Sequence, residues 1–158
     1  MRWRFVDRIL DFEPWARTRS LKSVSLEEYS LLERHGRAGA YPESLVLEAC
    51  VESARFLVAA SSGFESVAVL VEVREFRFVQ EAGMGDRLEI DVNVLERAEN
   101  ELRIACRAAV DAQGGARVVP SQVRTIAEGV LVLETVPLSE SFEREDMRVL
   151  WNEMHGAP

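Results

Sequence analysis

Residues 42–60 read PESLVLEACVESARFLVAA, and this stretch decides the fold. Pro42 suits a position at or near the start of a helix, where its missing N–H has no intrahelical partner to lose. The eighteen residues after it contain neither Gly nor another Pro, and apolar side chains occur on every side of the helical wheel. A helix that is apolar all round is typically buried, so we expect the rest of the chain to wrap around this one.

Two acids interrupt this apolar stretch. Glu48 and Glu52 are four residues apart and Arg55 follows three residues later, so all three share one face of the helix. An acid in a buried helix is unfavourable unless it is paired or used in chemistry. We expect burial to keep the Glu48 carboxyl partly protonated and able to donate a proton, or else Arg55 or a local hydrogen bond to satisfy it. For Glu52, an ion pair with Arg55 is the favoured interpretation.

The composition is that of an ordinary globular protein. The chain has 158 residues, 47% of them hydrophobic, which suggests one domain, and its net charge of −8 argues against binding to nucleic acid or to an anionic membrane surface. No apolar stretch approaches the roughly 20 residues that span a bilayer. Cys50 and Cys106 are far apart and belong to no CxxC or Cys/His cluster. We therefore expect two buried free thiols in a cytoplasmic protein.

The residues before the central helix predict a hairpin. Residues 3–13 mix apolar and charged side chains and lead into a strand, and Glu-Pro-Trp at 13–15 is a turn signal. Residues 16–25 are expected to form the second arm. A short helix over 26–34 and a glycine-containing loop over 35–41 then lead into the central helix.

The pattern changes after residue 60. Stretches rich in Val, Ile, Leu and Phe predict strand regions over 66–79, 87–97, 101–111 and 116–135. Residues 87–97 alternate cleanly between apolar and polar, which is the period of a strand with one buried face. We expect Pro120 and Gly129 to interrupt the last strand region. An amphipathic helix is expected over 141–154, with four apolar candidates for docking: Phe142, Val149, Leu150 and Trp151.

These elements predict an α+β fold. One strongly curved antiparallel sheet folded around the helix would cover the apolar surface on all its sides. Such a sheet still has edges left to pair. We therefore expect a homodimer with two-fold symmetry.

Three stretches carry a further signal: FVDRILDFEP at 5–14, YPESLVLEACVES at 41–53 and FRFVQEAGMGDRLEIDVNVLE at 76–96. In this order and spacing they resemble the hot-dog-fold 3-hydroxyacyl-acyl-carrier-protein dehydratases of the FabZ/FabA type. The second is similar to the Met-Pro-Gly-x-Leu-x-x-Glu-Ala-x-x-Gln that begins the family's central helix. We expect a hot-dog domain over 1–138, and packed on it a C-terminal helix and tail, 139–158, that the resemblance does not cover.

The resemblance also implies a chemistry. In the family, a histidine in a Gly-His-Phe-Pro-Gly loop removes the α-proton of a 3-hydroxyacyl thioester, and an acid on the partner's central helix acts on the leaving hydroxyl. The family's acid falls on Glu48 and its histidine position on Arg34, with His35 one residue later. Residues 36–39 take the place of the Phe-Pro-Gly. His35 and Glu48 are therefore the candidate catalytic residues.

Three further residues are candidates for substrate binding. Glu52 falls on a Gln of the family's motif and Glu43 on the Gly after its Pro, while Tyr41 either lines the pocket or packs under the start of the helix. Backbone N–H groups near the start of the helix are expected to hold the thioester carbonyl. The reaction needs no metal or nucleotide cofactor.

The implied substrate is a thioester of acyl-carrier protein or of coenzyme A. Its acyl chain is expected to lie in an apolar tunnel between two protomers. Five cationic residues are candidates for meeting an acidic carrier protein: Arg17, Arg19, Lys22, Arg34 and Arg37.

Three functions stay open on the sequence. The first is the dehydratase, which uses both His35 and Glu48. The second is a hot-dog acyl-thioesterase, in which Glu48 alone acts as a base on water or as a nucleophile. The third is a non-catalytic acyl-binding or partner subunit that has lost the family's histidine loop.

Overall fold

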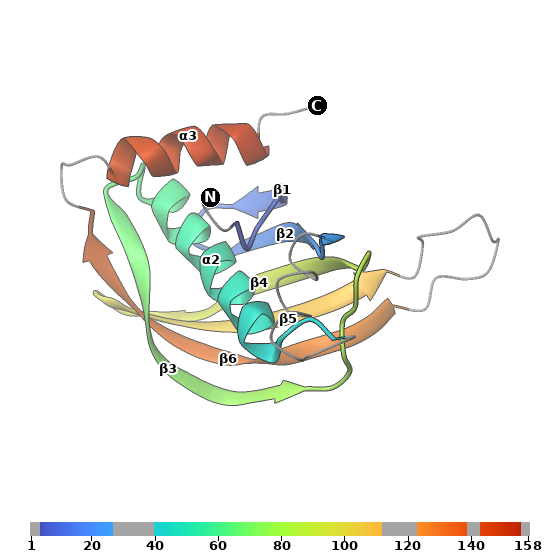
Figure 1. Cartoon of the computed structure of the whole chain (residues 1–158). Coiled ribbons are helices and arrows are strands. Elements are labelled where there is room, and N and C mark those ends of the chain that lie inside the picture. The colour runs from blue at the N-terminus through green and yellow to red at the C-terminus, as the bar shows by residue number, and fades with distance from the viewer. Residues whose placement is uncertain (1–3, 27–39, 112–122, 139–142, 156–158) are drawn as a thin grey trace.

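The computed structural model describes residues 4–26, 40–111, 123–138 and 143–155. Six antiparallel strands form one sheet in the order β1-β2-β4-β5-β6-β3. The sheet curves around a single long helix, α2, and a second helix, α3, lies at one end (Figure 1). The strands are β1 (Arg8–Glu13), β2 (Arg17–Ser23), β3 (Ser66–Phe78), β4 (Arg87–Arg97), β5 (Glu101–Asp111) and β6 (Val123–Pro137).

The central helix is confirmed. α2 covers Glu43–Ser61, and Pro42 precedes it as the N-cap residue with φ −60° and ψ 136°. The concave side of the sheet faces α2 (Figure 1), and together they enclose the main core. Its fully buried side chains include Leu57 from the helix and, from the strands, Leu88, Ile90, Ile104, Leu131 and Leu133.

The N-terminal hairpin is also confirmed. β1 and β2 pair antiparallel, and the turn between them passes through Trp15, whose φ is 56°. The described residues before β1, 4–7, form no helix and enter the strand directly. Leu26 is helical, but the rest of the short helix expected over 26–34 and most of the loop expected over 35–41 lie outside the described residues.

The strand after the first long turn, β4, has the predicted alternation. Leu88, Ile90 and Val92 are fully buried, whereas Asn93 on the other face is exposed. β5 pairs with β4 along its length, and the loop expected after β5, like Pro120, lies outside the described residues.

The expected interruption at Gly129 is wrong. β6 continues through this residue, which pairs with Cys106 of β5. A Cβ atom here would lie 2.5 Å from the Cα of Phe76 in β3. The glycine is therefore required by the close approach of β3, whose pairing with β6 shifts register between Arg74 and Arg77.

The terminal helix α3 (Glu143–His155) packs on β1 and α2 (Figure 1). Trp151 and Met154 are buried in a second apolar cluster with Val6, Ile9 and Phe56. Leu150 also packs against this cluster, but Val149 is 46% exposed, so its predicted docking role is wrong. It lies on the outer side of the helix, and Phe142 lies outside the described residues.

Candidate active site

Glu48 lies on a side of α2 that is open to solvent in the single protomer. Its Oε1 accepts a hydrogen bond of 2.8 Å from Nη1 of Arg55, and the side chains of both residues are 37% exposed. The expected burial of Glu48 is therefore not found, because this side of α2 is open in the single protomer. Of the two interpretations of Glu48, the structure has the ion pair with Arg55.

Glu52 is the more buried of the two acids. Its Oε2 accepts a hydrogen bond of 2.8 Å from the backbone N–H of Phe5. Burial raises the pKa of Glu52, and the bond from Phe5 and the charge of Arg55 only partly oppose this. The expected ion pair between Glu52 and Arg55 is wrong: the guanidinium bonds to Glu48, and Glu52 instead ties the N-terminal segment to α2.

A pocket of about 570 Å³ lies at the start of α2. Among the residues that line it are Tyr41, Pro42, Glu43, Ser44, Phe78 and Ile126. Tyr41 both lines the pocket and packs under the helix start, since it is 4% exposed and its N–H donates to the carbonyl of Ala82 over 2.6 Å.

The first turn of α2 brings backbone donors to this pocket. The carbonyl of Pro42 accepts the N–H groups of Leu45 and Val46, and no side chain caps the helix. The N–H groups of Glu43 and Ser44 precede the first intrahelical bonds. They form the positive end of the helix dipole, which favours negative charge developing on a bound oxygen.

A fixed turn closes the pocket on the side of the sheet. Oδ2 of Asp86 accepts hydrogen bonds of 2.8 Å from the N–H of Gly83 and from Nη2 of Arg124. Nη1 of Arg124 donates to the carbonyl of Glu81 over 2.6 Å. Arg124 was not among the residues that the sequence singled out, because its role depends on contacts with a turn 38 positions away.

The predicted site residues fall into two groups. Tyr41 and Glu43 meet at the pocket at the start of α2. Glu48 and Arg55 lie further along the helix, and Glu52 lines a smaller cavity of about 160 Å³ between α2 and α3. The second group therefore shares the helix but not the pocket, and His35 lies outside the described residues.

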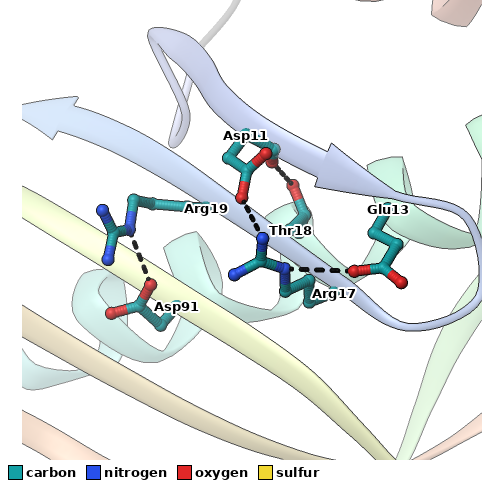
Figure 2. Close-up of polar contacts among 6 residues, drawn as sticks. All are labelled: Asp11, Glu13, Arg17, Thr18, Arg19 and Asp91. Carbon is teal, nitrogen blue, oxygen red and sulfur yellow. Dashed lines mark hydrogen bonds and ion pairs between the residues drawn. The ribbon is translucent and has the colours of Figure 1, made fainter.

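Of the five cationic residues proposed to meet a carrier protein, the three that the structure describes are already engaged. Figure 2 shows Arg17 between Asp11 and Glu13, at 2.9 Å and 3.3 Å, and Arg19 on Asp91 at 2.9 Å. These bonds are surface pairs on the hairpin and β4. Lys22 is 3% exposed and its Nζ donates to the carbonyl of Arg4. Arg34 and Arg37 lie outside the described residues.

Both cysteines are buried free thiols, as expected. A hydrogen bond with Cys106, together with burial, raises the pKa of the Cys50 thiol. Such a thiol is a poor nucleophile. Within the described residues, no three His, Cys, Asp or Glu side chains are grouped so that they could hold a metal ion. No helix of the described part is both long enough and apolar enough to cross a membrane.

Comparisons with known proteins agree with this fold. No family model matches the chain. It is 31% identical over 110 residues to the 3-hydroxyacyl-acyl-carrier-protein dehydratase FabZ of Nitrosospira multiformis, covering 67% of this chain and 75% of that protein. It is 31% identical over 132 residues to FabZ of Anaeromyxobacter sp. strain K, covering 81% of this chain and 79% of that protein.

Solved structures show the same architecture. A Streptococcus mutans protein bound to acetyl-CoA superposes with a TM-score of 0.61 at 12% identity, over 84% of this chain and 90% of that one. A hot-dog-like protein from Thermanaerovibrio acidaminovorans has a TM-score of 0.59 at 18% identity, over 87% of this chain and 90% of that one. At these identities the likeness concerns the fold alone, and it confirms the predicted hot-dog fold.

Proposed function

Because the chain belongs to the FabZ family of 3-hydroxyacyl-acyl-carrier-protein dehydratases, we propose that it eliminates water from a 3-hydroxyacyl thioester to give a 2-enoyl thioester. The observation that carries the proposal is the position of Glu48. The resemblance assigns it the role of the family's acid, and it lies on the open side of the central helix with its carboxylate held by Arg55. The pocket at the start of the same helix supports a bound thioester group.

The elimination needs three groups. A base removes the proton from the carbon next to the thioester carbonyl, an acid delivers a proton to the hydroxyl that leaves as water, and hydrogen-bond donors stabilise the enolate-like oxygen. We assign the first role to His35 and the second to Glu48. The N–H groups of the first turn of α2 take the third, beside Tyr41 and Glu43 in the pocket.

The proposed enzyme is a homodimer that pairs along β3. This strand ends the sheet, with β6 on one side and no neighbour on the other among the described strands. Three valines on it, Val69, Val71 and Val73, are 43%, 61% and 42% exposed. An exposed apolar edge strand is suited to pairing with a second copy. This pairing would cover the open side of α2 that carries Glu48.

The proposed substrate is carried by acyl-carrier protein, as the names of the relatives state for those proteins. Arg17, Arg19 and Lys22 do not support the docking of an acidic carrier protein, because their charges are already engaged. Coenzyme A thioesters are therefore the second carrier to test.

The ion pair between Glu48 and Arg55 favours one alternative, the acyl-thioesterase. A carboxylate that is paired with a guanidinium and reaches solvent suits a base acting on water, and this reaction needs no histidine. The two reactions leave different products, because hydration keeps the thioester whereas hydrolysis releases a thiol.

The test uses a short 2-enoyl thioester on acyl-carrier protein and on coenzyme A. Wild type, His35→Ala, Glu48→Gln and a control, Glu96→Gln on the exposed part of β4, are assayed for hydration and for thiol release. We expect wild type and control to hydrate the substrate, and the His35 and Glu48 variants to lose about 10²- to 10⁴-fold in rate. Thiol release that depends on Glu48 alone would establish the thioesterase instead. Absence of both activities in the wild type would indicate the non-catalytic subunit.

A further inference from the structure

We propose that Arg55 is a positioning residue for the dehydration, and that its guanidinium fixes the carboxylate of Glu48 toward the substrate. The inference rests on the proposed function, which gives Glu48 its role. It adds a residue that the resemblance to the family does not assign.

The geometry supports a fixed pair. Glu48 and Arg55 are seven residues apart on one rigid helix, which places them about two turns apart on the same face. Nη1 and Oε1 are 2.8 Å apart, which is the length of a charge-assisted hydrogen bond. The bond engages Oε1, so Oε2 is the oxygen that can face a substrate hydroxyl.

Arg55 has a second acid within reach, yet it does not bond to it. Glu52 lies between the two residues in sequence, and the charge of Arg55 partly opposes the rise that burial causes in the pKa of Glu52. Its carboxylate instead turns to the N–H of Phe5 at 2.8 Å. The guanidinium is thereby left to Glu48.

The arm of Arg55 is itself supported. The residue lines the small cavity between α2 and α3 together with Phe56, Met147 and Leu150. Apolar walls of this kind hold the methylene groups of an arginine while its head stays in contact with water. The apolar residues of this cavity can therefore restrict the stem of Arg55 while its guanidinium reaches Glu48.

Positioning of this kind affects turnover. A half-exposed glutamate has several rotamers, and only some of them aim its carboxylate at the reacting hydroxyl. Displacing a catalytic group by about 1 Å can lower the rate about 10²-fold. Because Arg55 acts through Glu48 and does not hold the thioester, its loss should lower kcat and leave KM nearly unchanged.

The test compares Arg55→Gln, Arg55→Lys and a matched control, Arg103→Gln. Arg103 makes an exposed ion pair of similar length with Glu96, 2.9 Å, on the sheet. Steady-state hydration of the 2-enoyl thioester gives kcat and KM for each variant, and thermal unfolding gives its stability. We expect Arg55→Gln to lose about 10- to 100-fold in kcat with KM within about twofold, Arg55→Lys to recover most of the loss, and Arg103→Gln to match the wild type.

Several results would overturn the inference. They are an Arg55→Gln variant with the kcat of the control, a change confined to KM, or a loss of kcat that lysine does not restore. If Arg55→Gln does not fold, Arg55→Met replaces it with the same expectations, since it keeps an apolar side chain for the cavity. If the wild type has no hydration activity, both the proposed function and the role of Arg55 are refuted. If the wild type is active and Arg55→Gln is equally active, only the role of Arg55 is refuted.

Discussion

The close approach of β3 to Gly129 predicts how much stability a substitution of this glycine would remove. In Gly129→Ala, the new Cβ would lie 2.5 Å from Cα, 2.8 Å from Cδ2 and 3.0 Å from Cβ of Phe76. The nearest atom belongs to the backbone, so a rotamer change of Phe76 cannot remove the clash. β3 is also constrained here, because its pairing with β6 shifts register between Arg74 and Arg77 and Glu75 has φ 49°.

The expected loss lies at the upper end of what overpacking causes, about 3 kcal/mol. For a chain of this size, 1 kcal/mol corresponds to about 2–4 °C in Tm, so Gly129→Ala should melt roughly 6–12 °C below the wild type. Thermal unfolding followed by circular dichroism measures this. In urea the midpoint should fall while the m-value stays unchanged.

Gly63→Ala is the control for this prediction. Its Cβ would meet nothing within 4 Å, but φ is +66°, so only backbone strain of about 1–2 kcal/mol is expected. A Gly129→Ala protein that melts within about 2 °C of the wild type would show that β3 does not cross β6 at this distance. The approach of β3 would then not be the reason why β6 carries a glycine at position 129.

Two further predictions concern buried polar groups. Burial raises the pKa of Glu52 above its value in the unfolded chain. The folded state therefore binds this proton more tightly than the unfolded state does. At any pH above the folded-state pKa, the charged carboxylate destabilises the folded state. Glu52→Gln, whose carbonyl can still accept the N–H of Phe5, should therefore raise Tm at neutral pH. The difference in Tm from the wild type should shrink as the pH falls through the folded-state pKa of Glu52. A variant that melts lower than the wild type at every pH contradicts this. Oγ of Ser20 and Oγ of Ser53 are hydrogen-bonded at 2.9 Å in the core. Ser53→Ala leaves the partner hydroxyl buried and should lose about 1–3 kcal/mol, whereas the double change with Ser20→Ala should lose less than the two single changes added together; strict additivity in urea unfolding would refute the coupling.

The elements of the fold were largely predictable because they depend on local patterns. The bounds of β4 and β5 follow from runs of alternating or β-favouring residues between turn signals, and α2 follows from an apolar stretch without Gly or Pro. Gly129 could not be interpreted in this way. Position 129 requires a glycine because the backbone of Phe76 lies too close for a Cβ atom. Such contacts depend on how two strands cross rather than on the residues next to the glycine.

Helical spacing predicted which of the candidate residues share a face of α2 but not which of them bond to one another. Spacing on the helix placed Glu48, Glu52 and Arg55 on one face, and it left two carboxylates for one guanidinium. The choice between the two carboxylates depends on Phe5, which lies 47 positions before Glu52. The backbone N–H of Phe5 donates a hydrogen bond to the carboxylate of Glu52. Helical periodicity carries no information on that contact. The exposure of Val149 is different: Met147, Leu150, Trp151 and Met154 recur at i, i+3, i+4 and i+7 as the face of α3 that docks, and Val149 lies off this face.

The most direct test of the proposed dehydratase activity is to follow oxygen-18 from labelled water. Wild-type protein is incubated with a short 2-enoyl thioester, and the products are analysed by mass spectrometry. A dehydratase, which runs in both directions, would place the label on the carbon-3 hydroxyl of an intact 3-hydroxyacyl thioester. Label in the carboxylate of a released acid, or no incorporation above the enzyme-free control, would contradict it.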